Sequence, residues 1–167
     1  YKVGTTVPVW SHAFSKFNTA PTISDISDKT TAEDTASGNI SFTVGDVEST
    51  PAYLSVTAAS SDTTLVPNEN ISLGGSDTNR TVNITPGSNQ SGTTTITVSV
   101  NDGNVTTSDT FLLTVSAVND APVADDQSVS MSWNTSMNIV LTGTDVEAST
   151  LTYDIVDAPT HGSLSGN

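Results

Sequence analysis

The stretch Thr93-Thr94-Thr95-Ile96-Thr97-Val98-Ser99-Val100 alternates apolar and hydroxyl residues over its second half. Successive side chains of a β-strand point to opposite faces, so Ile96, Val98 and Val100 share one face and the hydroxyl residues share the other. Similar short runs occur on both sides of this stretch. Turn signals separate them, among them Gly74-Gly75, Pro86-Gly87 and Asp102-Gly103. The pattern predicts antiparallel strands that each bury one face.

Residues 18–118 are expected to form one complete β-sandwich. The seven predicted strands lie near Thr22–Ile26, Gly38–Val44, Ala52–Ala58, Ile71–Leu73, Arg80–Thr85, Thr93–Val100 and Thr110–Val118. Seven short strands at this spacing are typical of an immunoglobulin-like sandwich, here without a disulfide because the chain has no cysteine. The candidate core residues are Phe42, Leu54, Val56, Val82, Ile84, Leu113 and Val115.

The chain is strongly acidic, with four basic and eighteen acidic residues and a net charge of −14. A chain with this charge is repelled by nucleic acid and by anionic lipid, so neither is expected as a partner. No apolar run approaches the ~20 residues that a membrane span needs. The charge does suit cation binding, high salt or solubility.

Two segments recur at intervals of about one hundred residues. Asn18-Thr19-Ala20-Pro21 returns 101 positions later as Asn119-Asp120-Ala121-Pro122. Gly45-Asp46-Val47-Glu48 returns 99 positions later as Thr144-Asp145-Val146-Glu147. A period of this length fits a whole β-sandwich better than a solenoid unit, whose periods run from roughly 20 to 50 residues. The repeat therefore predicts tandem sandwiches.

The two ends of the chain differ from the complete sandwich. Residues 1–17 carry four of the nine aromatic residues and no acid, and we expect either the closing strand of a preceding domain or a docking strand. Residues 119–167 match only the first half of a repeat, with strands expected near Gln127–Met131, Met137–Leu141 and Leu151–Val156. Half a sandwich leaves sheet edges and core residues uncovered, so a continuing chain or a neighbouring subunit is expected to complete it.

These motifs resemble those of bacterial cadherin-like tandem repeats, which occur in large surface proteins and adhesins. The resemblance covers residues 18–167. It is carried by Val118-Asn119-Asp120-Ala121-Pro122-Val123, by the Asp-Val-Glu turns and by Val100-Asn101-Asp102-Gly103 before the last strand of the first copy. It implies tandem cadherin-like sandwiches, the second incomplete, at the cell surface or outside the cell.

The resemblance also implies calcium between consecutive modules. The ligands carried over are Glu33, Asp102, Asn119, Asp120, Asp145 and Glu147. Calcium takes six to eight hard oxygen ligands, which carboxylates and linker carbonyls supply. Mutual repulsion of the carboxylates should leave the site loose until a cation arrives. The alternative is that Asp, Asn and Gly recur only because turns favour them.

Departures from the family pattern bear on these ligands. Ala117 stands where cadherin linkers carry an additional aspartate, and Trp133 stands in the second copy where the first has Glu33. Asp-Val-Glu also replaces the more usual Asp-x-Asp. A junction after the second copy would therefore lack one donor.

No catalytic residues are predicted, and the chain is not expected to be an enzyme. His12 and His161 are the only histidines and fall in different predicted units. Asp125 and Asp126 are adjacent on a predicted strand and would point to opposite faces, so they are not expected to share a substrate.

The favoured function is that of an extracellular structural or adhesive repeat module, a calcium-stiffened spacer in a long surface protein or filament. Its expected partners are neighbouring repeats or subunits. One alternative is a module that binds a surface glycan or protein, which an exposed Trp133 beside polar loop residues would favour. The other is a virion or appendage subunit completed by neighbouring chains.

Overall fold

The computed structural model describes residues 17–165, which divide into two compact units between Ser116 and Ala117. The predicted boundary lay two residues further on, after residue 118. Apart from Phe17, the predicted docking or closing segment 1–17 lies outside the described residues. The two units are described separately below.

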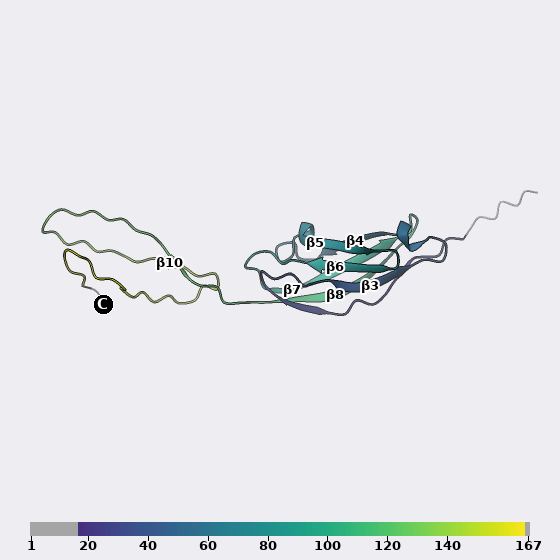
Figure 1. Ribbon diagram of the computed structural model, residues 1–167, viewed down its shortest axis with the longest axis horizontal. Helices are drawn as coiled ribbons and strands as arrows, with labels where there is room; N and C mark the ends of the chain where they lie inside the picture. The colour runs from purple at the N-terminus through teal and green to yellow at the C-terminus, as the bar shows by residue number, and fades with distance from the viewer. Residues whose placement is uncertain (1–16, 166–167) are drawn as a thin grey trace, which may run out of the picture. The chain divides into compact units, whose positions relative to one another are not determined.

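The first unit consists of two four-stranded sheets (Figure 1). The first sheet has the order β1-β3-β6-β5, from Thr22–Ile23, Ile40–Gly45, Asn79–Ile84 and Ile71–Ser76. The second has the order β2-β8-β7-β4, from Lys29–Ala32, Thr106–Ser116, Gly92–Asn101 and Ser55–Ser60. All pairings are antiparallel except that of β2 with β8, which is parallel.

This strand order is that of an immunoglobulin-like sandwich. The first sheet holds the first, second, fifth and fourth strands of the seven-strand pattern, and the second sheet holds the third, sixth and seventh. The short β2 is an additional strand, formed where the chain leaves the first sheet and joins the second. The only helical segments among residues 17–165 are two 3-10 turns, Pro51–Tyr53 and Asn68–Asn70, and no helix there is long and apolar enough to cross a membrane. The predicted all-β fold class is confirmed.

The alternating stretch on β7 forms the centre of the core. Ile96, Val98 and Val100 are fully buried, while Thr95, Thr97 and Ser99 between them are partly exposed. Six of the seven candidate core residues are buried, and the seventh, Val56, packs against the core while half-buried. The core also contains residues that were not predicted: Ile26, Val44, Leu65, Val66 and Phe111.

Two aspartates hold the segment between β1 and β2 against β8. Asp109 Oδ2 accepts a hydrogen bond from the Ile26 N–H at 2.8 Å, and Asp28 Oδ1 accepts one from the Leu112 N–H at 2.8 Å. These side chains satisfy backbone donors where no strand ladder is present. The strand predicted at Thr22–Ile26 therefore ends at Ile23, and the parallel β2 follows.

Gly74-Gly75 does not form the predicted turn. Strand β5 continues through both glycines to Ser76, and the chain turns at Asp77, which has a φ of 51°. Gly75 has a φ of +83°, and a Cβ there would lie 2.3 Å from the Asn79 carbonyl oxygen. The glycine signal thus marks a close approach of β5 to β6 rather than the turn itself.

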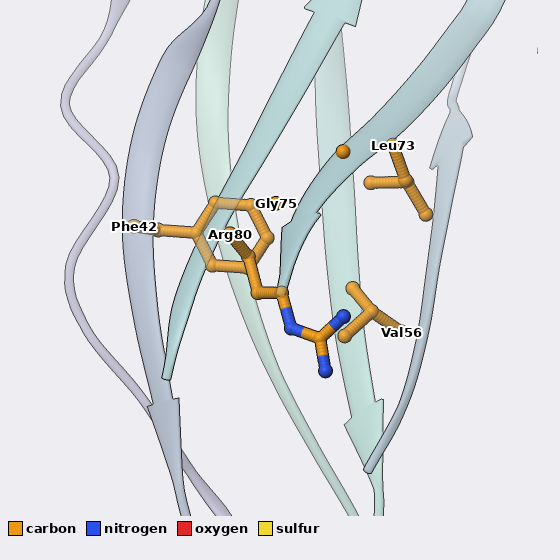
Figure 2. Close-up of a pocket in the computed structure, with 6 residues that line it drawn as sticks. Phe42, Val56, Leu73, Gly75 and Arg80 are labelled. Atoms are coloured by element: carbon orange, nitrogen blue, oxygen red, sulfur yellow. The ribbon is translucent and has the colours of Figure 1, made fainter. Parts of the chain in front are cut away.

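Arg80 on β6 links the two sheets. It lies opposite the buried Phe42 of β3 and so faces the interior, and its Nη2 donates to the Pro51 carbonyl at 2.9 Å, just before β4. Its Nε donates to the Asp77 carbonyl at 2.9 Å. Figure 2 shows the guanidinium beside Val56, at a small cavity of about 120 Å³. The single arginine of the chain therefore has a structural role at the edge of the core.

The second unit contains little regular structure. Val123–Ala124 (β9) pairs antiparallel with Gly143–Thr144 (β10). The strands predicted near Gln127–Met131, Met137–Leu141 and Leu151–Val156 are absent from the described residues, so that prediction is wrong. A strand needs apolar cover for its buried face, and the apolar side chains of the predicted segments lack it: Ile139, Leu141 and Ile155 are 41%, 49% and 62% exposed.

Replacement of Gly75 by alanine should destabilise the first unit by about 3 kcal/mol, because it adds a backbone clash to an unfavourable positive φ. Gly38→Ala is the matched control: Gly38 has a φ of +70° but no atom near its Cβ position. We expect that control to cost about 1 kcal/mol. Chemical denaturation of the three proteins measures the difference, and equal losses for the two variants would contradict the close-approach explanation.

Candidate functional site

Polar residues gather at one end of the first unit, where the chain enters the sandwich. We call this the linker end and define it by Asn18, Thr19, Asp46, Glu48 and Asp102. Asn18 and Thr19 precede β1, Asp46 and Glu48 follow β3, and Asp102 lies in the turn between β7 and β8. Hydrogen bonds connect all three segments, as described next.

The acidic turn after β3 is organised by Asp46. Its Oδ1 accepts the N–H groups of Glu48 at 2.9 Å and of Ser49 at 2.5 Å. This arrangement is the usual way in which an aspartate side chain stabilises a turn two residues ahead. The other carboxylate oxygen, Oδ2, is buried and has no hydrogen-bond partner. Asp46 thus fixes the turn with one oxygen, while the second is buried without a hydrogen-bond partner.

Glu48 connects this turn to the incoming chain. Its Oε2 accepts the backbone N–H of Thr19 at 3.0 Å and also the Thr19 hydroxyl. Hydrogen bonds to an ionised acceptor are stronger than those between neutral groups. The residue before Ala20-Pro21 is therefore held by an acidic side chain from a loop almost thirty positions away in the sequence.

Asp102 connects the β7–β8 turn to the same incoming chain. Its Oδ1 accepts the N–H groups of Asn104 at 2.7 Å and Val105 at 2.8 Å, and its Oδ2 accepts Asn18 Nδ2 at 2.8 Å. The bond from Val105, followed by those from Asn18 and Asn104, lowers the pKa of the Asp102 carboxyl below its ordinary value of 3.8. Asn104 Nδ2 in turn donates to Asn18 Oδ1 at 3.2 Å.

The second unit repeats part of this geometry. The backbone N–H of Asp120 donates to Glu147 Oε2 at 3.1 Å, which is the counterpart of the Thr19–Glu48 bond. Asp145 Oδ1 accepts the Ser149 N–H at 2.8 Å and so stabilises the second acidic turn as Asp46 does the first. The repeat seen in the sequence is therefore also a repeat of local contacts.

The six predicted calcium ligands do not form one group. Glu33 is buried at the end of β2, where its N–H donates to the Ser116 carbonyl at 2.9 Å. Asp102 follows Asn101, at the opposite end of the ten-residue β7 from Gly92, which pairs with Val115. At about 3.4 Å per residue the two ends lie roughly 30 Å apart. Glu33 and Asp102 cannot bind one ion, which corrects the predicted grouping.

The remaining predicted ligands lie in the second unit. The structure brings Asp120 and Glu147 together, with Asp145 in the same acidic turn, and Asn119 immediately precedes Asp120. The sequence prediction missed Asn18, Thr19, Asp46, Glu48 and Asn104 as members of a site. The repeat contained the needed signal, since Asn18 and Asp46 match Asn119 and Asp145.

The donors at the linker end suit a hard cation but do not form a finished site. Carboxylate, amide and hydroxyl oxygens are what calcium prefers, and the second oxygen of Asp46 has no hydrogen-bond partner. Within residues 17–165, however, no three carboxylate or histidine side chains are grouped closely enough to hold a metal ion. The carboxylates of Glu48 and Asp102 are engaged with Thr19 and Asn18 instead. A bound cation would require these side chains to move.

Comparisons with known proteins add the following. No protein-family model and no curated protein matches the sequence. A chimeric titin Z1Z2 carrying an exogenous decorin peptide is 15% identical, with a TM-score of 0.44 over 62% of this chain and 100% of that one. The titin domains Z1Z2 in complex with telethonin are 14% identical, with a TM-score of 0.45 over 66% of this chain and 55% of that one. Domains 4 and 5 of the S-layer protein SbsC are 17% identical, with a TM-score of 0.40 over 57% and 54%. The fold assignment rests on the strand order described above.

Asn18→Ala should raise the pKa of Asp102, because it removes one of the hydrogen bonds that stabilise the ionised carboxylate. The turn N–H groups of Val105 and Asn104 remain, so the pKa should stay below 3.8. A lowered pKa in the folded state adds stability that is present above 3.8 and is lost as the pH falls through the folded value. The variant should therefore show a weaker loss of stability in acid.

An NMR titration of the Asp102 carboxyl measures this shift directly. Asn68→Ala is the control, since Asn68 lies in the second 3-10 turn and accepts the Ser60 N–H instead. An unchanged Asp102 titration in Asn18→Ala would contradict the observed contact.

Proposed function

We propose that this chain is part of a long extracellular or cell-surface protein built from cadherin-like repeats, in which it acts as a structural or adhesive spacer. We further propose that calcium binds at the linker ends of its modules and stiffens them. Filaments and adhesins are the kinds of assembly in which such a spacer works, with neighbouring repeats or subunits as partners. We assign no catalytic role to it.

The single observation that carries this proposal is the repeated contact between an acidic turn and the incoming chain. In both units the glutamate of Asp-Val-Glu accepts the backbone N–H of the residue after asparagine, at 3.0 Å and 3.1 Å. A catalytic site would not need to recur in each module. A device that orients the chain where it enters each module would.

Calcium would supply charge neutralisation for the acids of the two loops that hold the incoming chain. In the first unit we propose Asp46, Glu48 and Asp102 as its ligands, with Asn18 from the incoming chain. In the second unit we propose Asn119, Asp120, Asp145 and Glu147. Glu33 lies at the opposite end of the first sandwich and is not part of the first set. The donor chemistry and the unpartnered oxygen of Asp46 support the first set.

Calcium should raise the melting temperature of the chain, because a ligand that binds only the folded state stabilises it by mass action. At one hundred times the dissociation constant the gain is about 2.7 kcal/mol, or on the order of 10 °C for a module of this size. Asp46→Asn keeps the oxygen that accepts the turn N–H groups and removes only the charge, so it should abolish most of this gain while the module remains folded.

Asp62→Asn is the matched control, because it makes the same change of charge in a turn whose N–H groups the aspartate also accepts, at the end of β4 beside Thr95 and so at the opposite end of β7 from Asp102. It should keep the full effect of calcium. Identical melting curves for the unmodified chain in chelator and in millimolar calcium would contradict the calcium part of the proposal. The spacer role would then rest on the repeat alone.

A second candidate function is recognition of a surface glycan or protein, and Trp133 favours it. This side chain is 90% exposed and stands in a polar turn, where the Thr135 N–H donates to the Ser132 carbonyl at 3.3 Å. Exposed tryptophans supply large contact area in binding sites. A change of tryptophan fluorescence on adding neutral oligosaccharides, lost in Trp133→Ala, would support this candidate, and no change would count against glycans.

A further inference from the structure

We infer that each module carries a latch that needs no metal: the glutamate of the acidic turn holds the incoming chain by a backbone N–H. In the first unit the latch is formed by Glu48 and Thr19, and in the second by Glu147 and Asp120. This inference goes beyond the proposed function, since it holds whether or not calcium binds. It makes Glu48 and Glu147 positioning residues for the chain that enters each sandwich.

The geometry of the first latch is prepared before the incoming chain is bound. Asp46 Oδ1 accepts the N–H of Glu48 itself, so the backbone that carries the glutamate is fixed by its own turn. Less conformational entropy is then lost when Glu48 Oε2 binds Thr19. Two donors of Thr19, the N–H and the hydroxyl, reach the same carboxylate oxygen.

The use of a backbone donor explains why the latch recurs although the side chains differ. The residue after asparagine is Thr19 in the first unit and Asp120 in the second, and an aspartate beside a glutamate would be expected to be repelled. Any residue other than proline, however, offers a backbone N–H. The observed bonds of 3.0 Å and 3.1 Å use this donor in both units. The latch therefore depends on the glutamate and on the path of the chain, not on the side chain that it holds.

Asn18 adds a second attachment in the first unit. Its side chain bonds Asp102 and Asn104 of the β7–β8 turn, while Thr19 bonds Glu48 of the other loop. Two consecutive residues are thus tied to two different loops, which restricts the direction in which the chain approaches the sandwich. A cation that recruits Glu48 as a ligand must compete with Thr19 for the same oxygen.

Amide hydrogen exchange of Thr19 in excess chelator tests the latch. In the unmodified chain this amide should exchange at least tenfold more slowly than in an unstructured peptide. Glu48→Ala removes the acceptor and should return the rate to that of the peptide, a roughly tenfold change that corresponds to ~1.4 kcal/mol. Glu48→Gln keeps a neutral acceptor and should give an intermediate rate, because charge-assisted bonds are the stronger ones.

The controls separate the latch from general stability and from calcium. Glu69→Ala changes an acid of the second 3-10 turn and should leave the Thr19 amide protected. Amides of β7 report global unfolding, so in every variant they should stay much better protected than Thr19 and change by no more than the same tenfold factor. In the second unit, Glu147→Ala should affect the Asp120 amide in the same way.

Two outcomes would overturn the inference. In the first, Thr19 exchanges at the peptide rate in the unmodified chain with chelator. In the second, it becomes protected only when calcium is added. The second outcome would leave the calcium proposal intact, whereas protection in chelator without any effect of calcium on melting would support the latch alone.

Discussion

Carboxylate oxygens that accept backbone N–H groups hold many of the loops and strand crossings of the described residues in place. At least nine of the eighteen acidic residues are used in this way: Asp28, Asp34, Asp46, Glu48, Asp62, Asp102, Asp109, Asp145 and Glu147. A sandwich satisfies its strand backbones by pairing, but its loops and crossings leave donors that need other acceptors. Here ionised side chains supply them, so the net charge of −14 is in large part a consequence of how the loops are built.

This use of acids changes how the composition should be interpreted. An acidic chain without cysteine suggests that a bound cation, rather than a disulfide, crosslinks the fold, and the family resemblance suggests the same. Asp46, Glu48 and Asp102, however, each accept hydrogen bonds from within the first unit, and the apolar core of β3, β6, β7 and β8 is closed without a disulfide. A cation at the linker end would therefore add to a folded module rather than create it. It would change how firmly the two loops hold Asn18 and Thr19.

The sequence alone predicted those parts of the fold that follow from the alternation of apolar residues. It did not predict the parts that depend on the path of the backbone. Ile96, Val98 and Val100 were assigned to the buried face because alternation reports burial directly. The strand β2 was missed because Lys29–Ala32 carries no such alternation and exists only as a parallel partner of β8. Gly75 was interpreted as a turn residue because glycine signals both turns and close approaches, and only the coordinates distinguish them. The expected strands of residues 119–167 failed for a related reason: their alternation requires a second sheet to cover it.

At the candidate site, too, the sequence revealed local motifs but not which segments far apart in the sequence lie side by side. The repeat singled out the Asp-Val-Glu turns and the Asn-x-Ala-Pro segments, which the structure brings into contact within each unit. Glu33 and Asp102 were placed at one junction because the family resemblance carried both over as calcium ligands. A strand has two ends, and the ten residues of β7 separate them by roughly 30 Å. Asp102 instead belongs with Asn18, since a hairpin turn that follows β7 lies at the end of the sandwich where the chain enters. Any ligand set for a cation in a module of this kind must therefore be drawn from one end of the sandwich, and the strand order decides which acids share that end.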